Sequence, residues 1–326
     1  MGRFTGICPV LEEPPVTTRP FQLPPIERLH WLSAGYCTHH EWVTMRGGVF
    51  QAVQFPAGFA CIEHPHAGLI LFDTGYSERF AKETSHFPTS IYGRLTPVYF
   101  QKEQSASSQL RQLGYAPQDV AIIMISHFHG DHIAGLRDFP NTQFIYAAEA
   151  YEAVYRKRGL AAVKAGYLPG LLPDDFEKRS RPFRLQPLSA SATKHSFPVS
   201  ALSAPSLAIP TEAVRYTALP NGSPFPVGYD ILGDGSLVAI DLPGHAAGQI
   251  GLFLSTTEQD YLLCADAAWS SRAIRDNLPP HPLAGIIMSN RKGYADSFAK
   301  LVELHQRFPS LCIMPTHCLE HQKVSY

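Results

Sequence analysis

The chain has 326 residues, of which 45% are hydrophobic, so it can bury the core of one large α/β domain or two smaller ones. Its 27 Lys and Arg residues balance 28 Asp and Glu residues, and the net charge of −1 argues against the basic excess of nucleic-acid-binding proteins. The sequence contains no apolar segment of membrane-spanning length, and its six cysteines are scattered without a C-x-x-C pair. We therefore expect a cytoplasmic protein with reduced thiols that binds neither nucleic acid nor a membrane.

The first half of the chain alternates strand and helix patterns. Residues 1–30 form a proline-rich arm without the apolar region of a signal peptide, and we expect residues 31–326 to form a single domain. Apolar segments at 58–65 and 67–75 predict two strands joined by a turn that contains proline. Helical spacing at 104–115 and a continuous apolar run at 119–126 then predict a helix and a buried strand. This alternation favours an α/β fold.

The pattern weakens between about residues 160 and 228, which are rich in Pro, Ser and Gly. A structureless loop of this length is uncommon in a compact domain, so we interpret it as an inserted cap or lid. Strand patterns return at 235–245, 248–255 and 261–269. The chain then shows a helical pattern at 294–308 and a last strand at 310–317.

One short stretch, "SHFHGDHIAGL" at 126–136, concentrates side chains that bind metals. It follows the apolar run at 119–126, and ligands gather at the carboxyl ends of strands in α/β folds. His127 and His129 share one side of an extended segment, whereas Asp131 and His132 can enter a helix and face a neighbouring point. Imidazole and carboxylate suit zinc, and also iron, manganese or cobalt. A solvated turn and a structural cluster are the alternatives.

Three later segments each place one ligand-type side chain after a predicted strand. His245 lies in "DLPGH", Asp266 in "LLCADAAW" and His317 in "IMPTH". A lone carboxylate at the end of an apolar strand is costly to bury without a partner. These three positions together favour a metal site over a chance cluster.

The order H-x-H-x-D-H, Pro-Gly-His, strand-ending Asp and late His resembles the metallo-β-lactamase superfamily, and "LILFDTG" around Asp73 is similar to its early strand-turn motif. The resemblance covers roughly residues 55–320 and implies a four-layer αββα sandwich with a metal site at one edge. It implies that Asp73 orients the metal loop from outside the ligand set. The implied ligands are His127, His129 and His245 for one metal, Asp131, His132 and His317 for the second, and Asp266 as a bridge between both.

Two divalent ions, zinc first, would provide a bridging hydroxide near neutral pH, which attacks a carbonyl or phosphoryl centre. Asp131 or Asp266 would then carry a proton to the leaving group. The layout is most similar to the N-acyl homoserine lactonase branch, which implies a quorum-quenching hydrolase that opens a lactone or small ester with an apolar portion, and is compatible with a homodimer. That branch commonly has a tyrosine three residues after the bridging aspartate, whereas this chain has Trp269. Indole can donate one hydrogen bond but cannot exchange a proton as a phenol does.

Two other functions remain open for these residues. A phosphotriester or aryl ester hydrolase would suit a pocket without that tyrosine, and a metal-binding protein of the same fold would need no hydrolytic activity. Trp269 is expected to form a pocket wall, and Phe128 to line the pocket or to pack in the core.

The remaining histidines have simpler interpretations. His64 and His66 have ligand-like spacing but lie in the predicted turn between two strands, so we expect them to stabilise that turn. His39 and His40 are expected in a solvated loop.

Overall fold

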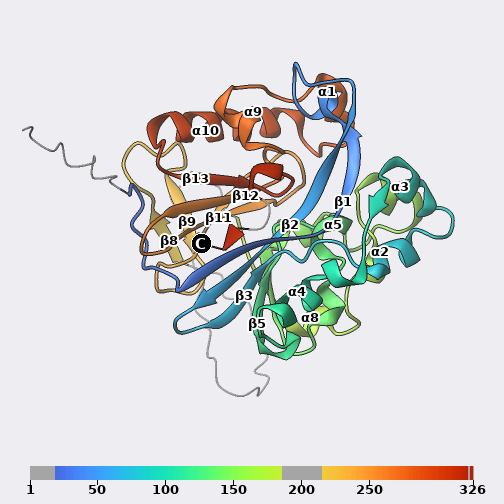
Figure 1. The fold of residues 1–326 in the computed structure, drawn as a ribbon, viewed down its shortest axis with the longest axis horizontal. Coiled ribbons are helices and arrows are strands. Elements are labelled where there is room, and N and C mark those ends of the chain that lie inside the picture. The colour runs from blue at the N-terminus through green and yellow to red at the C-terminus, as the bar shows by residue number, and fades with distance from the viewer. Residues whose placement is uncertain (1–18, 186–214, 322–323, 326) are drawn as a thin grey trace, which may run out of the picture.

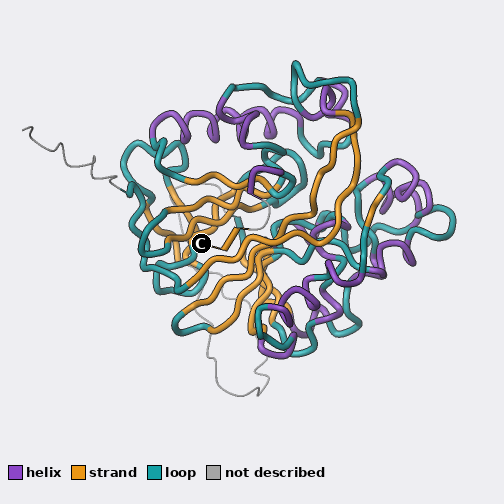
Figure 2. The backbone as a smooth tube through the Cα atoms, in the orientation of Figure 1, coloured by secondary structure: helices purple, strands orange, loops and turns teal. Residues whose placement is uncertain are grey.

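The computed structural model describes residues 19–185, 215–321 and 324–325. Within these residues two β-sheets pack face to face, and helices cover the outer face of each sheet (Figure 1). Figure 2 shows the same order of layers, with the sheets inside and the helices outside. The predicted αββα sandwich is therefore confirmed.

The first sheet carries the metal loop, residues 126–132, which follows β5. Its strands follow the order β14-β1-β2-β3-β5-β6-β7, with β4 paired to β1. Neighbouring strands from β3 to β7 are parallel, so their carboxyl ends meet at one edge. The described strands of this sheet are β1 (Arg28–His40), β2 (Ala52–His64), β3 (Gly68–Phe72), β4 (Val98–Tyr99), β5 (Val120–Met124), β6 (Gln143–Ala147), β7 (Ser180–Phe183) and β14 (Val324–Ser325).

The second sheet has the order β13-β12-β11-β10-β9-β8. Its pairs are antiparallel except β12 with β13, which run parallel and therefore end at the same edge. The described strands are β8 (Arg215–Ala218), β9 (Val227–Asp230), β10 (Val238–Asp241), β11 (Ile250–Ser255), β12 (Asp260–Ala265) and β13 (Cys312–Pro315).

The main core lies between the two sheets. Ile70 and Met124 from the first sheet and Leu252 and Leu263 from the second are all fully buried in one cluster. The β5 strand is apolar throughout because the second sheet covers one face and helices cover the other. This explains the continuous apolar run that leads into the metal loop.

The helices are short except α10, which packs on the second sheet. Asn290 caps it by accepting the Gly293 amide at 3.0 Å, and Phe298 and Leu301 bury its inner face. No helix in the described residues is long and apolar enough to cross a membrane. The described helices are α1 (Glu41–Thr44), α2 (Glu78–Glu83), α3 (Ser90–Leu95), α4 (Ala106–Gln112), α5 (Gly130–Ile133), α6 (Ala148–Glu152), α7 (Gly159–Lys164), α8 (Phe176–Arg179), α9 (Ser271–Arg275) and α10 (Arg291–Arg307).

The structure describes only parts of the predicted arm and cap. The β1 strand begins at Arg28, inside the predicted arm 1–30, and residues 1–18 lie outside the described residues. Inside the predicted cap of about residues 160–228, β7 joins the first sheet and β8 forms the edge of the second, so these two segments belong to the sandwich. Residues 186–214 lie outside the described residues, so a lid stays a prediction.

Two predictions about single histidines have clear outcomes. The loop expected at His39 and His40 is wrong, because both residues lie at the end of β1 and pair with β2. The turn role of His64 is confirmed, since its Nδ1 accepts the amides of His66 at 3.2 Å and Ala67 at 3.0 Å.

Candidate metal centre

The metal loop, residues 126–132, follows β5 and enters α5. Asp73, at the end of the neighbouring strand β3, holds the loop with three hydrogen bonds. Its Oδ1 accepts the Ser126 amide at 2.8 Å, and its Oδ2 accepts the Ser126 hydroxyl and His132 Nδ1, both at 2.7 Å. Asp73 is buried and has a φ of 63°, a left-handed conformation that persists in a side chain only when its surroundings enforce it. Asp73 therefore contacts the loop at Ser126 and His132, and its orienting role stays a prediction.

His245 comes from a turn of the second sheet that only glycine permits. Gly244, directly before it, has a φ of 132°, and an added Cβ would lie 2.0 Å from the backbone nitrogen of Tyr294 in α10. The turn therefore packs directly on the first turn of this helix. The His245 carbonyl accepts the Ser289 amide at 3.0 Å, which fixes the residue from the other side.

Asp266 and His317 follow β12 and β13, which end at the same edge. The backbone reaches Asp266 through Ala265, whose φ of 48° is unusual for alanine and redirects the chain at the end of the strand. His317 donates from Nδ1 to the Pro56 carbonyl at 2.7 Å. That bond directs its Nε2 into the cluster, and metal-binding histidines commonly donate their other ring nitrogen to a carbonyl in this way.

The structure brings all seven candidate ligands together in three groups of three that share members. The ligand atoms of each group lie within 4.8 Å of one another. Asp266 lies between the groups: its Oδ2 is 3.2 Å from His245 Nε2 and 3.0 Å from His317 Nε2. Two groups are His127, His129 and His245, and Asp131, His132 and His317, and the third, His127, His132 and Asp266, overlaps both.

Burial and mutual charge set the protonation of these side chains. Burial, reinforced by His245, lowers the pKa of His129 to about 3, so this imidazole is neutral at pH 7. Burial would raise the pKa of Asp266, but His317 and His132 outweigh it and hold the pKa well below the usual value. Asp266 is therefore an anion among imidazoles, which is the charge arrangement that a divalent cation prefers.

The donor set fits a pair of metal ions. Within the described residues, the buried atoms His127 Nε2, His132 Nε2 and Asp266 Oδ1 make no hydrogen bond. Leaving such atoms unsatisfied costs about 1–3 kcal/mol each, and the ring centroids of His127 and His132 lie only 4.0 Å apart. Cations would satisfy these lone pairs, and histidine with aspartate is the ligand chemistry of zinc and similar divalent ions.

Trp269 lies beside two candidate ligands of the second sheet, Asp266 and His245. Its indole Nε1 donates to Asp266 Oδ2 at 3.4 Å, and its ring lies edge-on to His245, with centroids 5.8 Å apart. The side chain is 7% exposed, so most of the indole packs against protein. These contacts place Trp269 beside the proposed ligands and occupy its single donor.

Phe128 points away from the metal loop. It is 2% exposed, and its ring contacts Tyr146, Tyr151 and Phe176 with centroids 5.1–5.9 Å apart. Packing in the core, the alternative that the sequence left open, describes these contacts. A role for Phe128 in a substrate pocket stays a prediction that they do not support.

The sequence did not indicate a role for two residues near the site, Ser126 and Gly166. Ser126 bonds Asp73 through both its amide and its hydroxyl, and Gly166 packs against the ring of His129. Ser126 directly precedes the first histidine, so its position was a usable signal. Gly166 lies 37 positions after His129, and nothing in the local sequence links the two.

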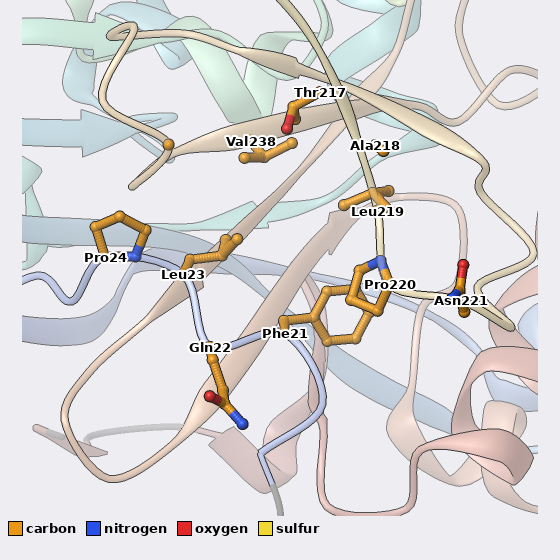
Figure 3. Close-up of a pocket in the computed structure, with 11 residues that line it drawn as sticks. Phe21, Gln22, Leu23, Pro24, Thr217, Ala218, Leu219, Pro220, Asn221 and Val238 are labelled. Atoms are coloured by element: carbon orange, nitrogen blue, oxygen red, sulfur yellow. The ribbon is translucent and has the colours of Figure 1, made fainter.

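A separate pocket of about 470 Å³ lies between residues 21–24 and the strands β8 and β10 (Figure 3). Phe21, Leu23, Leu219 and Val238 are among the side chains that line it. None of its lining residues is ionisable, and none is a candidate ligand. This pocket is therefore not the proposed reaction site.

The sequence pattern of the Metallo-beta-lactamase superfamily matches residues 62–308, about three quarters of the chain. The chain belongs to this superfamily. It is 27% identical over 249 residues to the N-acyl homoserine lactonase AttM of Agrobacterium fabrum, covering 74% of this chain and 77% of the relative. It is also 26% identical over 256 residues to a probable metallo-hydrolase of Mycobacterium tuberculosis, covering 77% of this chain and 71% of the relative.

Solved structures share the fold. The crystal structure of a quorum-quenching N-acyl homoserine lactone lactonase superposes with a TM-score of 0.60 at 19% identity, covering 93% of this chain and 96% of that one. The hydrolase AbOPH of the β-lactamase superfamily superposes with a TM-score of 0.53 at 14% identity, with 93% of each chain covered. Both structures therefore have the same sandwich architecture as this protein.

Proposed function

We propose that the protein is a metal-dependent hydrolase that opens lactones of the N-acyl homoserine lactone type. The observation that carries the proposal is the pair of ligand triads joined by Asp266. The similarity to lactonases such as AttM over three quarters of the chain supports the substrate class. Quorum quenching would be the consequence of such an activity.

The chain's residues divide into holding, orienting and proton-carrying roles. His127, His129 and His245 would hold one cation, Asp131, His132 and His317 would hold the other, and Asp266 would serve both. Asp73 orients the loop through Ser126 and His132. When bound, two divalent cations, zinc first, supply an ionised water and polarise the lactone carbonyl.

Asp131 and Asp266 are the acid–base candidates. When the water oxygen has bonded to the carbonyl carbon and the ring C–O bond breaks, the ring oxygen must gain a proton to give the hydroxy acid. Asp131 is 9% exposed and Asp266 is 3% exposed, so Asp131 is the more accessible carrier of that proton. Asp266 remains an anion because the surrounding imidazoles keep its pKa low.

The remaining proposals concern the cellular location of the protein, its substrate and its partners. We propose a cytoplasmic location, supported by five described cysteines that are all free thiols. The substrate is a small molecule with an apolar portion. The balanced charge supports neither nucleic acid nor a membrane surface as a partner, and a homodimer is compatible with the fold.

A phosphotriester or aryl ester hydrolase is the second candidate. The observation that favours it is Trp269, whose indole donor is bonded to Asp266 rather than available to a lactone carbonyl. A metal-binding protein of the same fold without hydrolytic activity is the third candidate.

The test combines metal analysis with turnover of an N-acyl homoserine lactone, an aryl ester and a phosphotriester. We expect two bound metals, a preference for the lactone, and loss of lactone turnover in His129→Ala. His66→Ala is the matched control, because this exposed histidine lies outside the cluster. Preference for the aryl ester or the phosphotriester would select the second candidate. Two bound metals with no turnover would select the third.

A further inference from the structure

Exposed apolar side chains gather on two segments that are far apart in the sequence. The first segment is the connection between β1 and β2, which contains α1. The second is the 3₁₀ helix η5 (Pro282–Ile286) together with the residue that follows it. Phe50 is 82% exposed and Ile286 is 71% exposed, and three further apolar residues of these segments are more than half exposed. This surface is called the apolar patch, and its residues are Val49, Phe50, Leu283, Ile286 and Ile287.

Contacts between the two segments make the patch one surface. The His281 amide donates to the Val43 carbonyl at 3.0 Å. The Trp42 ring contacts both segments, because its centroid lies 5.6 Å from that of Phe50 and 5.1 Å from that of His281. Figure 1 shows α1 at the outer end of β1 and β2. The apolar patch is therefore a continuous surface at this end of the two strands.

The patch is large for a protein that stays a monomer. At about 200 Å² for a fully exposed large apolar side chain, its residues expose roughly 600 Å². The largest apolar patch of a monomeric protein is usually about 300–600 Å², and a stable interface buries about 800 Å² on each partner. Within the described residues no segment covers the patch. Its size therefore fits the apolar centre of a protein interface whose rim is polar.

The rim of the patch carries unpaired charges of both signs. Glu41 lies beside Val49 and accepts its amide at 2.8 Å. Arg291 lies beside η5 and donates to the Gly285 carbonyl at 3.0 Å. Neither side chain forms an ion pair within the described residues. When two copies meet about a twofold axis, the Glu41 side of one copy can lie against the Arg291 side of the other, so the patch is complementary to itself.

These charges favour a protein partner over a lipid surface. A surface that binds anionic lipids usually carries a cluster of about 4–8 Lys and Arg residues. The two segments and the start of α10 provide three exposed cations, Arg46, Arg291 and Lys292, together with the acidic Glu41. Most soluble oligomers are homo-oligomers, and twofold dimers are the commonest. A second copy of the chain therefore fits the patch better than a membrane does.

We propose that the apolar patch is the contact surface of a homodimer, in which it packs on the same patch of a second copy. Glu41 of each copy then pairs with Arg291 of the other. The surface lies next to the candidate centre, because Ser289, two residues after Ile287, donates its amide to the His245 carbonyl at 3.0 Å. The second copy therefore stands beside the metal site of the first.

The test measures the mass of the metal-loaded full chain in solution, by sedimentation over a range of protein concentrations. We expect a dimer for the wild type. Phe50→Asp and Ile286→Asp should each weaken dimerisation about tenfold or more, because they place a charge inside an apolar contact. Leu160→Asp is the matched control, because this leucine of α7 is also more than half exposed but lies outside the patch. Unchanged circular dichroism and metal content show that each variant is folded.

Exchange of the rim charges tests the pairing across the interface. Glu41→Arg and Arg291→Glu should each dimerise more weakly than the wild type, since like charges then face each other. An equimolar mixture of the two variants should form a mixed dimer that is more stable than either variant's own dimer. No gain on mixing would contradict the pairing of Glu41 with Arg291.

Three results would overturn the dimer surface as a whole. The first is a wild type that is monomeric at every concentration, and the second is a dimer that Phe50→Asp and Ile286→Asp leave unchanged. The third is a monomer that binds vesicles of phosphatidylcholine and phosphatidylglycerol and loses this binding in Phe50→Asp, which would assign the patch to a lipid surface. None of these measurements needs substrate, so their outcome does not depend on the proposed hydrolase activity.

Discussion

Asp266 shows how one side chain can serve two groups of ligands. One of its oxygens faces His245 and His317, and the other lies 3.4 Å from His132. It holds this position because the backbone turns sharply at Ala265, directly before it. A buried carboxylate among imidazoles is stable only as part of a charge network, so its neighbours must be placed as accurately as Asp266 itself.

A substitution at Asp73 tests whether the candidate ligands must be positioned accurately, and it leaves every candidate ligand in place. We expect Asp73→Asn to weaken zinc binding about 10- to 100-fold, because the amide has one acceptor oxygen in place of two and cannot accept from both the Ser126 amide and His132. It should also lower the free energy of unfolding by about 1–3 kcal/mol. Titration with a competing chelator and urea unfolding measure the two effects. The exposed Asp174 offers the control Asp174→Asn, and equal zinc affinity in the two variants would contradict the role of Asp73.

At the scale of elements, the segment after α7 supports the metal loop from outside. The Gly166 carbonyl accepts the Gly130 amide at 3.1 Å, and Gly166 adopts a φ of 61°. An added Cβ would lie 2.6 Å from the ring of His129. This described part of the predicted cap region therefore positions a candidate ligand.

Gly166→Ala should therefore displace His129 and reduce both zinc affinity and lactone turnover by on the order of tenfold or more, since small displacements at a reacting centre have large effects. Metal analysis and steady-state kinetics measure these changes. Gly114→Ala is the matched control: Gly114 has a φ of 93° and no atom within 4 Å of the added Cβ. It should lose about 1–2 kcal/mol of stability from backbone strain alone and keep its metals. If Gly166→Ala also keeps full activity, the loop does not depend on this contact.

At the scale of the whole molecule, the candidate centre joins the two sheets. Residues 127–132 follow β5 of the first sheet, whereas His245, Asp266 and His317 follow β10, β12 and β13 of the second. Each triad takes ligands from both sheets. Bound cations would therefore link the two halves of the sandwich at one edge.

Removal of metal should for this reason destabilise the whole domain. A ligand present at a thousandfold excess over its Kd adds about 4 kcal/mol, so we expect a chelator to lower the melting temperature by several degrees or more. Calorimetry with and without added zinc measures the shift. His129→Ala should show a much smaller shift, and a melting temperature in the wild type that does not respond to metal would refute the link.

The sequence alone determined the local features of this protein. The apolar run of β5 and the periodicity of α10 predict those elements, because burial and backbone geometry act over a few residues. The spacing of His127, His129, Asp131 and His132 likewise predicts a metal loop, since the preceding strand fixes where the loop begins. The three later candidate ligands, each after a strand, are predicted by the same kind of local pattern.

Only the tertiary structure decided which distant side chains support that loop. The contacts of Asp73 with Ser126, of Gly166 with His129 and of Tyr92 with Gly130 depend on the path of the whole chain. The sequence pattern also gave a wrong prediction at His39, which lies on β1. This end of the strand is stabilised by pairing with β2, and the residues around His39 carry no signal of that pairing. Local geometry is set by neighbours in sequence, whereas the direction in which Phe128 or Trp269 points is set by the sheet and helices packed around it.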